Sequence, residues 1–385
     1  MKRISNLLVA AAIGMAAVGA SAATPVTSSP FPASKAPRAS QASSITQSIG
    51  MVTVKIDYSS PLVHAADGTD RRGAIWGKLV PYGLTNLGFG TCTKCPWRAG
   101  ANENTTFTTS HDIAVEGQKL PAGTYGLFMI PDPTEWTVIF NRNHNAWGSF
   151  FYDEADDQLR VKVKPVKAEL HEALTYDFID RHADHATLAL QWEELSVPIR
   201  ITVPDSDELY MAGMRHDMQG EPGFDYMNVM AASQFAMAHK HPVEGLQWAE
   251  YAVSGPFVGR ADFQTLMNLA DAQEVNGKTA DAAATREKVF SLASTASPTD
   301  LHVYARQLLN RKHKEEAIRV WNLNAKLHPG VWPVNVGLAR ASSAAGNYAE
   351  ALKYARLAVP QAPDDLNRRV LEAAIKKLEA GQDMN

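Results

Sequence analysis

The sequence has few of the features that would directly assign it a chemistry. It contains no serine-hydrolase elbow, no phosphate-binding P-loop, no dinucleotide-binding glycine fingerprint and no His-Glu-x-x-His zinc motif. It has no run of lysine and arginine, and its formal net charge is -4, so a nucleic-acid partner is not favoured. These absences argue against several common enzyme classes and favour a protein that binds without catalysis.

Long apolar runs are also scarce. The run from Leu7 to Ala20 is too short to span a bilayer, and no later stretch predicts a transmembrane segment. It follows the basic pair Lys2 and Arg3 and ends in Ala20-Ser21-Ala22, a small-x-small cleavage pattern. We therefore expect a signal peptide over residues 1–22 and a periplasmic or secreted protein. Its removal takes the net charge from -4 to -6.

Composition and the period of apolar residues divide the next part of the chain into two segments. Residues 23–44 are rich in Pro, Ala and Ser and are expected to form a flexible tether. Residues 45–204 contain short alternating runs such as Val52–Tyr58, separated by turn residues, which predict an all-β sandwich. Further strands are expected at residues 105–109, 124–130, 136–140, 159–163, 174–179, 187–192 and 197–203.

After a linker at residues 205–223, the period becomes helical and a repeat emerges over residues 224–385. Glu316-Ala317 recurs 34 residues later as Glu350-Ala351, and Pro329 recurs as Pro363. This region resembles the tetratricopeptide repeat family, which implies an all-α solenoid of three to four helix pairs. The last unit carries the family pattern at Leu338, Ala339, Gly346, Tyr348, Ala351, Ala358 and Pro363, whereas the preceding unit departs from it at Lys312 and Asn324.

The β domain carries an ordered set of motifs rich in Gly, Trp and Arg. They are Ile56-Asp57-Tyr58-Ser59-x-Pro61, the stretch Arg72 to Gly83, Trp97-Arg98-Ala99-Gly100-Ala101-Asn102-Glu103, Leu120 to Tyr125, and Trp136 to Asn141 with Trp147-Gly148. This set resembles the bacterial family named domain of unknown function 2911. The resemblance implies a β-sandwich and an exported location, and brings no established activity. The segment Leu84 to Pro96 departs from the family pattern and contains both cysteines of the chain.

Cys92 and Cys95 allow three interpretations. A local disulfide is favoured, because an exported chain with two cysteines usually pairs them. A metal site would need two more ligands, for which His64 and His111 are available by residue type. Thiol-redox chemistry ranks third, since the flanking residues do not predict a helix N-terminus at the first cysteine.

Met214, His216 and Met218 form a second candidate for metal binding. Thioether and imidazole ligands suit copper. The alternative, which we favour, is that these methionines pack against the repeats. No cofactor is certain, and copper and zinc are the ions that these residues suggest.

A ligand pocket is predicted around Arg72, Arg98, Asn102 and Glu103, which lie in the motifs beside Trp76 and Trp97. A guanidinium fork among aromatic side chains can hold a carboxylate or a phosphate. The alternative, slightly favoured, is an internal Arg–Glu pair that fastens two loops to the sandwich.

The histidines His182 and His185 are interpreted as exposed loop residues. They would face one ligand if their segment were helical, but the neighbouring residues are β-like.

Together these patterns lead to a non-catalytic binding or adaptor protein, whose repeats dock a protein or peptide partner. The rival hypothesis is a metal-binding or thiol-redox function of the β domain centred on Cys92 and Cys95.

The expected signal peptide gives a first prediction. N-terminal sequencing of the protein recovered from the exported fraction should begin at Ala23. A start at Met1 would contradict cleavage.

Overall fold

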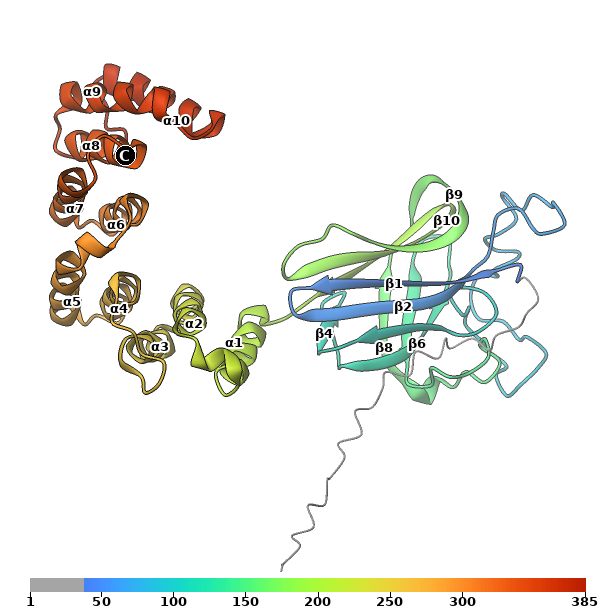
Figure 1. Ribbon diagram of the computed structural model, residues 1–385. Helices are drawn as coiled ribbons and strands as arrows, with labels where there is room; N and C mark the ends of the chain where they lie inside the picture. The colour runs from blue at the N-terminus through green and yellow to red at the C-terminus, as the bar shows by residue number, and fades with distance from the viewer. Residues whose placement is uncertain (1–37) are drawn as a thin grey trace, which may run out of the picture. The chain divides into compact units, whose positions relative to one another are not determined.

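The computed structural model describes residues 38–385, which divide into two compact units after Ser206 (Figure 1). The expected signal peptide and the first part of the expected tether lie outside the described residues. The two units are described separately.

The first unit consists of two antiparallel sheets. The larger sheet has the strand order β1-β2-β3-β6-β7-β8, and the smaller has the order β5-β4-β10-β9. The strands are β1 (Gln41–Ile49), β2 (Val52–Ser60), β3 (Thr105–Thr109), β4 (Ile113–Val115), β5 (Gln118–Leu120), β6 (Gly123–Ile130), β7 (Trp136–Asn141), β8 (Asp157–Val163), β9 (Val166–Ile179) and β10 (His185–Thr202). A single 3-10 turn, η1 (Glu154–Asp156), precedes β8. The all-β prediction is confirmed.

Alternation of apolar and polar residues explains how the sheets pack. Val52, Val54 and Ile56 of β2 are buried, whereas the residues between them are exposed or half-buried. Contacts such as the edge-to-face pair of Tyr58 on β2 and Tyr176 on β9, with ring centroids 4.9 Å apart, join the two sheets. The core therefore lies between the sheets, as in a sandwich.

The first strand begins earlier than the composition suggests. Gln41 to Ser44 were expected to belong to the tether, but they pair with Asp57 to Ser60 of β2. Their side chains are mostly exposed, so they lack the apolar alternation of an inner strand. Backbone hydrogen bonding to β2 holds this polar segment in place, and composition does not report that interaction.

A long segment without regular strands, residues 61–104, connects β2 to β3. Backbone bridges fix it. Trp97 exchanges two hydrogen bonds of 2.8 Å with Met129 of β6, and Thr85 pairs with Cys95 at 2.9 and 3.0 Å. The cysteine-containing insertion is thus an ordered loop held on the larger sheet.

The second unit is helical. Its helices are α1 (Ser206–Asp217), α2 (Tyr226–Ala238), α3 (Pro242–Ser254), α4 (Phe263–Val275), α5 (Thr279–Ser291), α6 (Pro298–Asn310), α7 (Lys314–Leu327), α8 (Trp332–Ala344), α9 (Tyr348–Ala358) and α10 (Asp365–Glu379), with short 3-10 turns η2 (Glu221–Phe224), η3 (Ala293–Thr295) and η4 (Val359–Gln361). The stretch expected to be a linker, residues 205–223, contains α1. None of the helices within residues 38–385 combines the length and the apolar character needed to cross a membrane.

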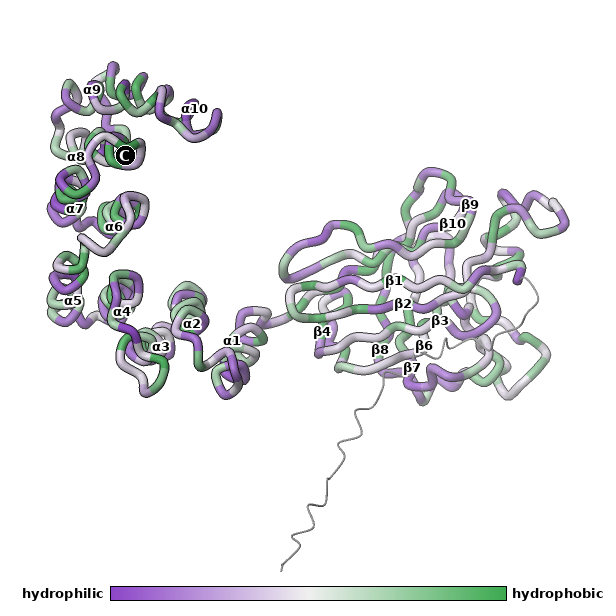
Figure 2. Tube along the Cα trace, in the orientation of Figure 1, coloured by the Kyte–Doolittle hydropathy of each residue, from purple (hydrophilic) through white to green (hydrophobic). Residues whose placement is uncertain are grey.

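Helices α2 to α9 form four consecutive pairs, and α10 packs on α9. The first helices of the last two pairs begin at Pro298 and Trp332, 34 residues apart, as the repeat predicted. Close approach is possible because small residues lie at the contacts: a Cβ on Gly337 would lie 2.6 Å from the ring of Trp321. Hydrophobic and hydrophilic residues alternate along the helices (Figure 2). The tetratricopeptide-like prediction is confirmed.

One buried histidine gives this unit a pH dependence. His302 of α6 is almost fully buried, and burial, reinforced by Arg340 and Arg306, lowers its pKa to about 4. Between pH 6.5 and 4 the unfolded chain therefore binds the proton and the folded chain does not. The contribution of neutral His302 to the free energy of unfolding is fully present above about pH 6.5 and is lost as the pH falls.

We predict that the free energy of unfolding of the helical unit falls by about 1–2 kcal/mol between pH 7 and pH 5 through this group. Urea titrations followed by helical circular dichroism measure it. The variant His302→Gln should lose that part of the pH dependence. An identical slope in both proteins would contradict the assignment.

Candidate functional site

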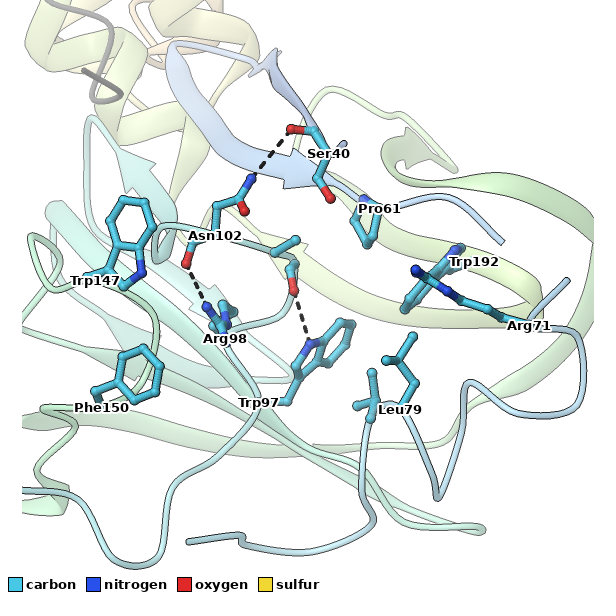
Figure 3. Close-up of a pocket in the computed structure, with 13 residues that line it drawn as sticks. Ser40, Pro61, Arg71, Leu79, Trp97, Arg98, Asn102, Trp147, Phe150 and Trp192 are labelled. Carbon is cyan, nitrogen blue, oxygen red and sulfur yellow. Dashed lines mark hydrogen bonds between the residues drawn. The ribbon is translucent and has the colours of Figure 1, made fainter. Parts of the chain in front are cut away.

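The β domain contains an open cleft of about 390 Å³ (Figure 3). It is built by four segments: the residues just before β1, the long connection between β2 and β3, the loop between β7 and η1, and strand β10. The lining residues are Ser40, Pro61, Arg71, Leu79, Val80, Trp97, Arg98, Gly100, Ala101, Asn102, Trp147, Phe150 and Trp192.

A cluster of four tryptophans supports the cleft. Trp76 packs edge to face on Trp136, Trp192 and Trp97, with ring centroids 5.1, 5.6 and 5.7 Å apart. Trp136 belongs to β7 of the larger sheet and Trp192 to β10 of the smaller. The cluster therefore fastens the irregular connection to both sheets, and Trp97 and Trp192 form part of the cleft wall.

Two donors of this cluster have no partner. The indole Nε1 atoms of Trp76 and Trp192 are buried, and neither finds an acceptor within residues 38–385. Leaving a buried donor unpaired costs about 1–3 kcal/mol. Trp192 lines the cleft, but its Nε1 atom is itself buried and is not presented to solvent.

The turn at residues 97–103 sets the position of Arg98. Ala99 and Asn102 adopt positive φ values of 52° and 56°, an uncommon conformation for residues other than glycine. The surrounding structure holds this strained turn: the Tyr176 hydroxyl donates to the Ala99 carbonyl at 2.8 Å, and the Ala101 amide donates to the Ser59 carbonyl at 3.1 Å. These contacts from both sheets therefore fix the direction in which the Arg98 side chain leaves the turn.

Arg98 is half-buried beside aromatic rings. Its Nη1 donates to the Asn102 carbonyl at 2.7 Å, and its guanidinium carbon lies 5.7 Å from the ring centroid of Phe150. Gly148 makes room for it, since a Cβ there would lie 2.8 Å from Nη1. Burial lowers the pKa of Arg98, although arginine remains charged in proteins.

Arg71 approaches the cleft from beside Trp192, away from Arg98 (Figure 3). Within the described part of the chain, no carboxylate forms an ion pair with Arg71 or Arg98, and no Asp or Glu lines the cleft. The cleft therefore presents two positive groups among aromatic surfaces without a negative group from its own lining.

The structure separates the six residues that the sequence grouped as a pocket. Trp97, Arg98 and Asn102 line the cleft, and Trp76 lies in the supporting cluster. Glu103 is buried; it accepts from the Ser59 hydroxyl at 3.2 Å and pairs with Arg38 at 2.7 Å. An internal Arg–Glu pair exists, as the alternative expected, but its arginine is Arg38.

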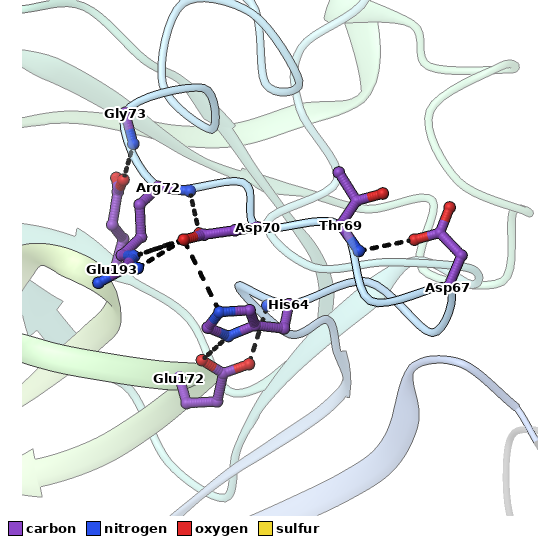
Figure 4. A network of polar contacts seen from close by, with 8 residues as sticks. All are labelled: His64, Asp67, Thr69, Asp70, Arg72, Gly73, Glu172 and Glu193. Atoms are coloured by element: carbon purple, nitrogen blue, oxygen red, sulfur yellow. Dashed lines mark hydrogen bonds and ion pairs between the residues drawn. The ribbon is translucent and has the colours of Figure 1, made fainter.

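Arg72 lies outside the cleft. It forms an exposed ion pair with Asp70 at 2.6 Å, whose hydrogen bonds lower the pKa of Asp70 to about 2 (Figure 4). The same network holds His64, whose Nδ1 lies 2.9 Å from Glu172 of β9. This network of ion pairs ties the loop after β2 to β9.

Four charged or aromatic residues of the cleft were not predicted from the sequence: Arg71, Trp147, Phe150 and Trp192. Trp147 belongs to a motif of the family-like set, which was a usable signal. Arg71 adjoins Arg72, but nothing in an irregular segment indicates which of two neighbouring arginines faces inward.

Cys92 and Cys95 form a disulfide. Both lie in a small apolar cluster with Phe128, Ile139 and Tyr152, so the bond is shielded from an attacking thiol. Bonded sulfurs provide no thiolate for a metal ion. The other proposed ligands are engaged elsewhere: His64 with Glu172, and His111 with the Ser110 hydroxyl at 2.9 Å. This geometry favours the disulfide interpretation.

The methionine candidate lies on and just after α1. Met218 packs against a core of Val229, Ala252 and Val258, whereas His216 is exposed and Met214 half-buried. This arrangement favours packing over a copper site.

Comparisons with known proteins agree with the β-domain resemblance. Residues 40–201 match the family model described as "Protein of unknown function (DUF2911)", so this part of the chain is similar to that family. No curated protein matches the chain. A solved tetratricopeptide repeat protein from Parabacteroides merdae ATCC 43184 is similar over 43% of this chain and 63% of that one, with 17% identity and a TM-score of 0.31. The chain therefore covers less than two thirds of that protein.

Proposed function

We propose that the β domain is a non-catalytic binding domain for a small organic anion with an apolar or aromatic body. One observation carries the proposal: Arg71 and Arg98 line an aromatic cleft that contains no acidic residue. A carboxylate or phosphate would complete the hydrogen bonds of the guanidinium groups, and Trp147, Phe150 and Trp97 would cover the apolar part.

Energetic considerations support this proposal. A buried guanidinium without a counter-charge is unfavourable, because its hydration is lost and no ion pair replaces it. Arg98 is half-buried and carries part of this cost, since the one side-chain hydrogen bond of its guanidinium goes to a neutral carbonyl. An incoming anion offers a counter-charge and further acceptors to this group.

The composition of the cleft also favours binding over catalysis. General acid–base chemistry needs a group that exchanges a proton near neutral pH, usually His, Asp, Glu, Lys, Cys or Tyr. The cleft lining contains none of these residue types. Its arginines stay protonated and suit charge recognition.

This proposal predicts the effect of Arg98→Ala. Tryptophan fluorescence would be titrated with naphthyl phosphate and naphthalene carboxylate, and with the neutral naphthalene carboxamide as the uncharged counterpart. The anions should quench the wild-type signal to saturation and bind more tightly than the amide. Losing a charge-assisted hydrogen bond of about 1.5–3 kcal/mol should weaken anion binding about 10- to 100-fold in Arg98→Ala.

Arg72→Ala is the matched control, because it removes a neighbouring arginine outside the cleft. It should bind the anions as the wild type does. Arg98→Lys keeps the charge and loses the planar fork, so its affinity should be intermediate. Equal affinity of Arg98→Ala and the wild type, or no preference for anions over the amide, would refute the proposal.

A second function, partner binding by the helical repeats, is favoured by the turn between α3 and α4. Phe257 is fully exposed and adopts a φ of 65°. Its neighbour Val258 is buried with Val229 and Ala252, and the Gly259 amide donates to the Gly255 carbonyl at 2.7 Å. The turn thus presents an aromatic side chain to solvent despite a strained backbone, as an anchor for a protein or peptide partner would require.

Affinity capture from the source cell envelope with the full chain as bait tests this function. Phe257→Ala should lose the captured partner, whereas Val243→Ala, which truncates another exposed apolar residue of the same unit, should retain it. A partner captured equally by both variants, or none by the wild type, would count against docking at this turn.

Export is part of the proposal. The basic, apolar and small-residue pattern of the first 22 residues supports it. So does the Cys92–Cys95 disulfide, since such bonds persist in oxidising compartments.

A further inference from the structure

The turn between β9 and β10 brings together residues that the sequence treats as unrelated loop positions. Strand β9 ends at Ile179 and β10 begins at His185. The His182 amide donates to the His185 carbonyl at 2.8 Å and closes the turn. A φ of 49° at Asp180 redirects the chain just after the strand. A tight strand turn thus places residues three apart side by side without a helix.

Three potential ligand atoms converge there. His182 Nε2 lies 3.1 Å from Asp180 Oδ1, and His185 Nε2 lies 3.9 Å from Asp180 Oδ2. The imidazole rings stack with centroids 4.3 Å apart and an interplanar angle of 20°. The ligand atoms of all three residues lie within 4.8 Å of one another. Around a tetrahedral ion with bonds of about 2.0–2.1 Å, ligand atoms lie about 3.3 Å apart, so small side-chain movements would complete the geometry.

A second carboxylate orients one of these histidines. Asp184 Oδ1 lies 2.7 Å from His185 Nδ1, which assigns the proton to Nδ1 and leaves the Nε2 lone pair directed at the cluster. The Val203 amide donates to the Asp184 carbonyl at 2.7 Å and holds that residue in place. A carboxylate behind a ligating histidine is a usual second layer of metal sites.

We propose that Asp180, His182 and His185 bind one divalent transition-metal ion of the zinc type at this hairpin. Two imidazoles and one carboxylate suit Zn²⁺, and the same set binds Cu²⁺ more tightly in the general order of first-row ions. Asp184 is a positioning residue that acts through His185. This site is independent of the anion cleft and of the two cysteines.

The exposure of the three ligand side chains determines how readily the site would exchange its ion. The side chains of Asp180 and His182 are about half exposed, and His185 is 18% exposed. Three protein ligands leave a coordination position open to water, so the ion would exchange readily and could accept a further ligand from a partner. The only cation beside the cluster in the described contacts is Arg200, whose Nη1 lies 3.7 Å from Asp180 Oδ2. That exposed pair is weak and is easily displaced by a divalent ion.

The test uses the full mature chain without a histidine tag, stripped with EDTA and dialysed. Zn²⁺ affinity is measured by competition with a chromophoric chelator, and Co²⁺ loading is followed by its visible absorption. We expect one Zn²⁺ per chain and a Co²⁺ spectrum typical of mixed nitrogen and oxygen ligands. The double variant His182→Ala/His185→Ala should not bind at concentrations that saturate the wild type.

Two further variants make the result specific. Asp184→Asn should weaken Zn²⁺ binding about 10- to 100-fold, as expected when the carboxylate behind a histidine ligand is neutralised. His216→Ala removes an exposed histidine of α1 and should bind as the wild type does. Circular dichroism verifies folding, which these substitutions in and near a surface turn should preserve. Zn²⁺ bound equally by the double variant, or no binding by the wild type, would overturn the proposal.

Discussion

The packing of four tryptophans between two sheets is the constraint on which the rest of the β domain depends. Trp136 and Trp192 come from opposite sheets, and Trp76 and Trp97 come from one connection that has no regular strands of its own. A connection of this length would be costly to order without such anchors, since each ordered residue loses about 1–2 kcal/mol of backbone entropy. Large aromatic surfaces offset that loss through burial.

The cleft follows from this anchoring. Once Trp97 is fixed in the cluster and on Met129, the next residues must turn sharply to reach β3. The turn takes two positive φ values and directs Arg98 between Phe150 and the Asn102 carbonyl. The domain therefore has a rigid frame that holds a positive charge in an aromatic cleft without supplying a carboxylate to pair with it, which is the arrangement of a preorganised anion site.

Sequence reasoning recovered the parts of the structure that follow from periodicity. Alternation at period two predicted most of the strands, and the recurrence of Glu316-Ala317 at Glu350-Ala351 predicted the helix pairs, because stacked units must bury equivalent positions. The three-residue strands β4 and β5 are too short to show a period, and the two strands expected at residues 187–192 and 197–203 are one continuous strand, β10. The edge strand at Gln41 was missed because its backbone pairing leaves polar side chains exposed.

The site residues were less predictable for a physical reason. Side-chain direction in an irregular segment depends on individual φ values and on distant contacts, so Arg71 and Arg72 look equivalent in sequence and face different surroundings. The β-like neighbours of His182 and His185 do not predict a common ligand, since residues three apart on a regular strand do not face one another. A five-residue hairpin turn brings them together.

That the cleft receives an anion at Arg98 is tested most directly by nuclear magnetic resonance of the arginine Nε–Hε groups during addition of an aryl phosphate. The signal of Arg98 should shift and saturate at one equivalent, while that of Arg72 stays in place. Shifts spread over many exposed arginines without saturation would contradict a binding cleft.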